Sequence, residues 1–179
     1  MQGVKTGLLT LLLPFASLAD THWAVAEGLG NMRFQGEIIA ESCRVDAENQ
    51  QLIIHMGRVS SNRFHTAGEM ADAVPFEIHL SDCNTLVRQQ IGISFRGVVD
   101  DKNPEVLSVG EGSGIATGVG IALFDNNNQL IHLNSPAFKL RQLPTGANTL
   151  NFVARYKAIS NQVTGGTANA QVWFSLTYQ

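Results

Sequence analysis

The chain has few charged residues and few cysteines, and both shortages limit what it can do. Only 15% of its 179 residues are charged, and the net charge is -3. Its lysines and arginines form no basic stripe or cluster, which argues against nucleic acid as a partner. Few charges and 17 glycines fit a β-protein with many turns. With 44% hydrophobic residues, the chain can bury a core, and its length suggests one domain with appendages.

Sequence motifs for catalysis are missing as well. The five histidines are scattered, without a His-x-His or His-x-x-x-His pair, and His79 falls in the polar phase of its segment. There is no Gly-x-Ser-x-Gly elbow and no glycine-rich phosphate loop between a strand and a helix. The run over residues 110–114 imitates a Gly-x-Gly motif, but no helix follows it. We therefore expect no enzyme, no cofactor and no metal site.

Long apolar runs are also missing, except near the N-terminus. The apolar run over residues 7–18 follows Lys5 and is too short to span a bilayer, but it suits a secretory signal. Pro14 argues against the alternative, a buried N-terminal helix. Residues 1–26 are the predicted signal peptide, since Ala24-Val25-Ala26 fits the cleavage pattern, with cleavage after Ala19 as the alternative. We expect an exported, soluble mature protein.

Export changes how the two cysteines, Cys43 and Cys83, are interpreted. An oxidising compartment keeps such a pair closed, so a disulfide is the default prediction. It would close a loop of about 40 residues and contribute roughly 4 kcal/mol in the chain-entropy model. Two free, buried thiols are the alternative. A metal site is disfavoured, because there is no Cys-x-x-Cys pair.

Most of the remaining chain alternates between apolar and polar residues. Apolar residues at every second position indicate half-buried β-strands. Turn-forming sequences separate these segments, and none of them carries a helical period. The pattern therefore predicts an all-β sandwich. The expected strands span residues 52–57, 74–81, 91–97, 119–124, 130–133, 138–143 and 148–159.

Two further alternating segments lie near the ends of the chain. The last one follows the Gly165-Gly166 turn and continues to the final residue, so something must hold this terminus in place. Trp173 is its one exception. The other segment precedes Cys43 and has a glycine on its apolar face, which weakens a strand or marks a close backbone approach. The apolar positions are Ala170, Val172, Phe174, Leu176 and Tyr178 in the last segment, and Met32, Phe34, Gly36, Ile38 and Ala40 in the earlier one.

These features occur together in one order. The segment 34–39 precedes Cys43, the second cysteine follows about 40 residues later, and Val74-Pro75-Phe76 leads into it. Tyr178 is the penultimate residue, and Gly166 is fourteenth from the end. In this combination the chain resembles the fimbrial subunits, or pilins, of the bacterial chaperone–usher pathway, similar to the major and minor pilins of type 1 fimbriae.

The resemblance implies a fold and a way of assembling. Pilins are immunoglobulin-like sandwiches that lack the seventh strand, which leaves a hydrophobic groove beside the C-terminal strand. A periplasmic chaperone lends a strand to this groove, and at the outer-membrane usher the N-terminal extension of the next subunit replaces it. Because groove and extension are different parts of one subunit, the contact builds an open filament.

For this chain the resemblance implies a structural subunit of an adhesive fimbrium on the cell surface, exported through the periplasm. Residues 27–42 would be the donor-strand extension and residues 43–179 the pilin domain. The alternative is a self-contained secreted sandwich, for instance a carbohydrate-binding module. The implied donor residues are Met32, Phe34, Gly36, Ile38 and Ala40, and the implied groove and chaperone strand holds Gly166, Val172, Phe174, Leu176, Tyr178 and Gln179.

Overall fold

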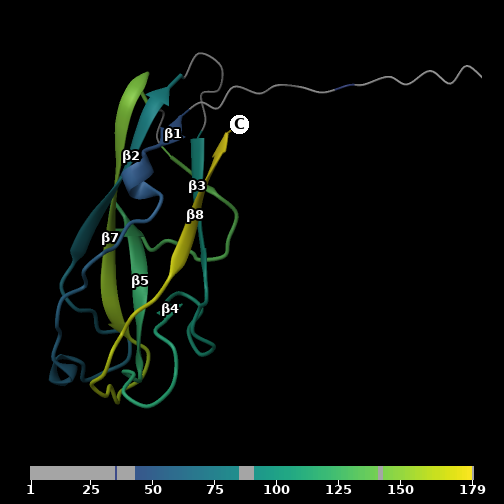
Figure 1. The fold of residues 1–179 in the computed structure, drawn as a ribbon. Helices are drawn as coiled ribbons and strands as arrows, with labels where there is room; N and C mark the ends of the chain where they lie inside the picture. The colour runs from purple at the N-terminus through teal and green to yellow at the C-terminus, as the bar shows by residue number, and fades with distance from the viewer. Residues whose placement is uncertain (1–34, 36–42, 85–90, 141–142, 179) are drawn as a thin grey trace, which may run out of the picture. The chain divides into compact units, whose positions relative to one another are not determined.

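The computed structural model describes residues 43–84, 91–140 and 143–178, together with Gln35. Contacts divide the chain into two units, Met1–Glu37 and Ile38–Gln179, and the fold lies in the second unit. That unit is an antiparallel β-sandwich of two sheets (Figure 1). One sheet has five strands in the order β1-β2-β7-β5-β4, and the other has three strands in the order β6-β3-β8.

The five-stranded sheet is built around β7, which pairs with β2 on one side and with β5 on the other. The pairing of β2 with β7 shifts register between Leu80 and Cys83, where Asp82 has a φ of 54°. Two short strands pair at the outer sides of β2 and β5. The strands are β1 (Arg44–Val45), β2 (Val74–Cys83), β4 (Leu107–Ser108), β5 (Val119–Asp125) and β7 (Gly146–Ala158).

The three-stranded sheet has β3 at its centre. On one side β3 pairs with β8 along a seven-residue ladder that runs from Ile91 opposite Tyr178 to Gly97 opposite Val172. On its other side it pairs with only two residues of β6. The strands are β3 (Ile91–Gly97), β6 (Phe138–Lys139) and β8 (Val172–Tyr178); two 3-10 turns, η1 (Ala47–Asn49) and η2 (Ser61–Arg63), lie between β1 and β2.

The core lies between the two sheets and is formed by the alternating apolar residues of their strands. Phe152 of β7 is at its centre. Its ring stacks on Phe76 of β2 at 5.4 Å and meets Phe95 of the opposite sheet edge-on at 5.3 Å. Aromatic pairs in these geometries add stability beyond the area they bury. The period-two pattern of the sequence thus becomes the inner faces of the sandwich.

The outer face of β5 is buried too, which explains why this strand is apolar without alternation. Ala122 and Phe124 pack there against Val106 from the loop before β4. Arg155 of β7 places its guanidinium 5.9 Å from the ring centre of Phe124. Glu105 of the same loop forms an ion pair with Lys157 of β7. Lys157 donates a hydrogen bond to Glu105 at 2.8 Å, and this contact lowers the pKa of the Glu105 carboxyl.

Four of the expected strands are confirmed, namely residues 74–81, 91–97, 119–124 and 148–159. Three are wrong in part or in whole. Residues 52–57 join no ladder within the described chain, and 130–133 form only an isolated bridge between Phe124 and Leu130. Of 138–143, only Phe138–Lys139 are paired. Local alternation shows which face of a segment is buried, but it does not show whether a neighbouring backbone is available to pair with it.

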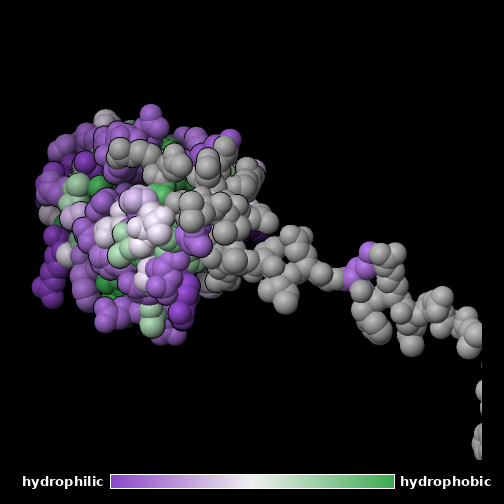
Figure 2. All heavy atoms as spheres, turned by 90° about the horizontal axis from the view of Figure 1, so that it is seen from above, coloured by the Kyte–Doolittle hydropathy of each residue, from purple (hydrophilic) through white to green (hydrophobic). Residues whose placement is uncertain are grey.

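Hydrophilic side chains make up most of the described surface at the end of the molecule that Figure 2 shows. Hydrophobic side chains appear there only in small areas. Within the described ranges, no helix is long and apolar enough to cross a membrane.

Cys43 and Cys83 form a disulfide, as the sequence predicts. Both are buried, and the bond joins the residue immediately before β1 to the last residue of β2. The link crosses 40 residues of sequence that include η1, η2 and the loop between them.

Replacing both cysteines with serine is therefore expected to lower the free energy of unfolding by roughly 4 kcal/mol, because the unfolded chain regains the freedom of this loop. Urea-induced unfolding of the two proteins measures the difference. An equal midpoint and slope for both proteins would contradict the expectation.

Candidate functional site

The last strand, β8, is only half covered. Its side chains alternate as the sequence predicts, with Trp173, Ser175 and Thr177 exposed on the outer face. Its inward side chains are partly accessible over the whole strand, whereas Ile78 and Leu80 on the inward face of β2 are each 1% exposed. One flank of these side chains packs on β3, and no described strand pairs with the other flank. The sandwich is thus open along β8.

A groove of about 1320 Å³ lies at this opening. One rim is formed by residues 49–58, with Val45 of β1 beside it, and the other by residues 168–174, which include the first half of β8. The floor consists of core side chains from both sheets, so the groove opens directly into the hydrophobic core. The floor residues are Phe76, Ile78, Phe95, Leu107, Ile121, Leu123, Ala154 and Tyr156.

The rim opposite β8 behaves like a strand without neighbours. Ile54 and Met56 are half-buried and pack against the core, while Ile53 between β1 and η2 is 78% exposed. Among the described residues, no backbone hydrogen bond joins 52–59 to another segment. The groove therefore has an apolar floor, and the backbone groups that face it from either rim pair with no other described strand. Backbone N–H and C=O groups in such positions require partners when water is removed from them.

The end of the groove where the chain enters β8 is held in place by Tyr156. Its hydroxyl donates a hydrogen bond to the carbonyl of Ala168 at 3.0 Å, and burial raises the pKa of this phenol. A second anchor lies just before it, where Thr167 and Ala116 are joined by a backbone hydrogen bond of 2.9 Å. Gly166 fits closely in this contact, since a Cβ atom there would overlap the backbone of Ile115 and Ala116.

The other end of β8 is fixed to the disulfide. The hydroxyl of Tyr178 donates a hydrogen bond to the carbonyl of Cys43 at 2.8 Å. Tyr178 is thereby attached to the residue that precedes β1, across 135 residues of sequence. This contact explains how the C-terminal strand remains ordered although one of its sides is open.

Comparison with known proteins shows what this open sandwich is. A family model described as "Fimbrial protein" matches residues 32–179. The chain belongs to this family. It is 37% identical to the probable major fimbrial subunit LpfA of Escherichia coli O157:H7 over 94% of each chain, and 34% identical to the long polar fimbria protein A of Salmonella typhimurium, again over 94% of each.

Solved structures agree with this assignment. A Burkholderia pseudomallei antigen and type I fimbria protein is 34% identical, with a TM-score of 0.60 over 78% of this chain and 91% of that one. The P pilus rod subunit PapA has a TM-score of 0.67 over 78% of this chain and 100% of that one. At 21% identity PapA shows the fold alone. The chain is a structural fimbrial subunit with an immunoglobulin-like sandwich, located in a fimbrium on the cell surface.

In this fimbrial subunit, the residues expected at the C-terminal end occupy several places. Val172 and Phe174 line the groove, and the ring of Phe174 lies 6.5 Å from that of Phe95 on the floor. Leu176 and Tyr178 share the same face nearer the disulfide, and Gly166 precedes the rim. The strand begins at Val172, two residues later than its alternation suggests. The expected donor residues Met32, Phe34, Gly36, Ile38 and Ala40, and also Gln179, lie outside the described residues.

Several groove residues are not predicted from the sequence. Tyr156 and Phe95 lie in segments that the sequence predicts only as strands, and the segment 52–57 is likewise predicted only as a strand. The signal in the sequence is the run Leu52-Ile53-Ile54, because three consecutive apolar residues place one on each face of a strand, and Ile53 is indeed 78% exposed. In the described part of the chain, no three His, Cys, Asp or Glu side chains gather as metal ligands would.

Gly166→Ala is expected to destabilise the subunit by roughly 1–3 kcal/mol, because the new methyl group must displace the backbone of Ile115 and Ala116. Gly165→Ala is the matched control, since a Cβ atom at that neighbouring position meets no atom within 4 Å. Its effect should stay within about 0.5 kcal/mol. Urea unfolding of the three proteins tests the difference. Equal losses for both variants would show that the close contact at Gly166 is unimportant.

Proposed function

We propose that the groove beside β8 is an acceptor for a β-strand and that the subunit polymerises by donor-strand exchange. The observation that carries the proposal is the half-buried inward face of β8 above a floor made of core residues. An open sheet edge over an exposed core binds an added strand readily and aggregates when it does not. Residues 27–42 of a neighbouring copy are the proposed donor.

The two rims support strand addition because both have unpaired backbone groups. A strand between β8 and residues 52–58 would make main-chain hydrogen bonds to either side, which give affinity. The apolar floor would take alternate side chains, which gives register. A strand rises about 3.3 Å per residue, so the seven residues of β8 offer an edge of roughly 23 Å. The alternating donor positions from Met32 to Ala40 cover a comparable length.

The same geometry supports a chaperone before assembly. An isolated subunit would expose Val172 and Phe174 together with the core residues below them. We therefore propose that a periplasmic chaperone lends a strand to β8. At the usher, the extension of the next subunit would then replace the chaperone strand. This route requires export, for which residues 1–26 are the proposed signal peptide, residues 27–42 the extension and residues 43–179 the pilin domain.

We propose a structural role without catalysis. A self-contained binding module would be expected to close β8 with a strand of its own.

A peptide of residues 27–42 is expected to bind the chaperone-bound subunit and displace the chaperone strand, whereas the same peptide with Gly36→Leu should bind about 5- to 150-fold more weakly. The reason is an overpacking cost of roughly 1–3 kcal/mol where the donor backbone lies flush in the groove. Fluorescence competition between labelled and unlabelled peptides measures the ratio.

Gln35→Leu is the matched control peptide, because position 35 is in the opposite phase of the alternation and would point out of the groove. It should exchange like the natural sequence. Equal exchange by all three peptides would sink the donor-strand assignment. Gly36→Leu placed in the full chain should leave the unfolding midpoint of the subunit unchanged, because the extension completes a neighbour and not its own sandwich.

A further inference from the structure

A second long strand edge exists in this sandwich, and it is closed by different means. The ten-residue strand β2 pairs with β7 on one side, but on its other side the two-residue strand β1 covers only Leu80 and Ser81. The remaining length of this edge, from Val74 to His79, has no strand beside it in the described structure. A long edge of this kind is a template for pairing with another chain.

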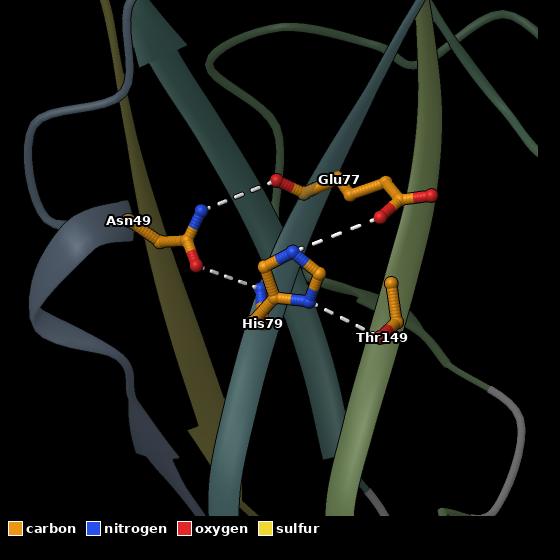
Figure 3. A network of polar contacts seen from close by, with 4 residues as sticks. All are labelled: Asn49, Glu77, His79 and Thr149. Atoms are coloured by element: carbon orange, nitrogen blue, oxygen red, sulfur yellow. Dashed lines mark hydrogen bonds and ion pairs between the residues drawn. The ribbon is translucent and has the colours of Figure 1, made fainter.

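The side chain of Asn49, the last residue of η1, lies against this edge (Figure 3). Its Oδ1 accepts a hydrogen bond from the backbone N–H of His79 at 3.0 Å, and its Nδ2 donates one to the backbone carbonyl of Glu77 at 3.3 Å. A carboxamide carries one acceptor and one donor group, as a peptide unit does. Asn49 is 4% exposed, so its amide is buried in this contact. It takes the place that a residue of an added strand would occupy.

The neighbouring positions of the edge are closed as well. The backbone N–H of Asp46 donates to the carbonyl of His79 at 3.1 Å, which completes the hydrogen bonding of that residue. Backbone groups alternate in direction along a strand, so Pro75, Glu77 and His79 all present theirs to this side. Proline has no N–H to donate. On this side of β2, His79 has both backbone groups bonded, Glu77 has its carbonyl bonded, Ser81 is covered by β1, and Pro75 has no N–H to offer.

The outer face beside this edge is held by side chains that link the two strands. In Figure 3 the imidazole of His79 lies between the carboxylate of Glu77 at 3.6 Å and the hydroxyl of Thr149 on β7 at 3.2 Å. These contacts lie on the outer face of β2 at the same residues that Asn49 binds through their backbone. The edge of β8 has no equivalent cover among the described residues.

We infer that Asn49 and Pro75 block strand addition at β2 and so confine it to β8. The inference rests on the proposed donor-strand function, and it adds the residues that decide which edge accepts a strand. A filament grows without branches only if each subunit offers one acceptor edge. Opening the β2 edge would give each subunit a second acceptor, and chains would then join at both.

The test fills the β8 groove first and then asks whether a second strand binds. The full chain is saturated with the peptide of residues 27–42, and its mass is followed by native mass spectrometry and light scattering. The wild-type protein should show one subunit with one peptide. Asn49→Ala frees the N–H of His79 and the carbonyl of Glu77, so this variant should take up a second peptide or a further subunit.

Asn148→Ala is the matched control. The amide of Asn148 also bonds to backbone, donating to the carbonyls of Pro144 at 2.8 Å and Gly146 at 3.2 Å, but it leaves the β2 edge closed. This variant should keep the wild-type mass. An Asn49→Ala protein that stays at one subunit with one peptide would overturn the inference, as would equal extra association by both variants.

Two further measurements cover the cases in which Asn49→Ala does not fold or the wild-type protein binds no peptide. If Asn49→Ala does not fold, Pro75→Ala restores an N–H to the same edge with Asn49 in place and should also gain mass beyond one peptide. A Pro75→Ala protein with the wild-type mass would then overturn the inference. A wild-type protein that binds no peptide would instead refute the proposed donor-strand function, on which the inference depends.

Discussion

The edge of β8 along the groove, which no described strand covers, is the constraint on which the rest of this structure depends. A sandwich with a complete second sheet would bury the inward side chains of β8 as deeply as it buries Ile78 and Leu80. Here they remain partly accessible, and the floor below them is the core itself. Apolar surface left in contact with water lowers the stability of the isolated subunit. Burial of the same surface would provide the binding free energy of a partner strand.

The anchors at both ends of β8 follow from this constraint. A strand that pairs on one side only has half the usual backbone contacts, so it needs fixed ends to keep its shape. Tyr178 supplies one through the carbonyl of Cys43, and Tyr156 supplies the other through the carbonyl of Ala168. The groove is therefore held open between two fixed points, and an arriving strand meets an ordered edge.

Much of the fold could be predicted from the sequence, because alternation reports directly on which face of a strand is buried. Alternation predicts the strands β2, β3 and β7, and it places β8 with an error of two residues. The apolar segment 119–124 predicts β5, and the expected export of the chain predicts the disulfide. The second rim of the groove is predicted only as another strand, because the short apolar segment 52–57 does not show whether a neighbouring backbone pairs with it. Asn49 left no signal at all, because its role depends on a neighbour 30 residues away.

The bond between Tyr178 and Cys43 also has a mechanical consequence. In a fibre joined through residues that precede Cys43, tension enters each sandwich at that residue. It is divided there between the disulfide, which leads into β2, and the tyrosine hydroxyl, which leads into β8. The strand that borders the proposed acceptor groove is therefore tied to the point where the load arrives. In such a fibre, force would enter the sandwich through β2 and β8, the two strands that are joined at Cys43.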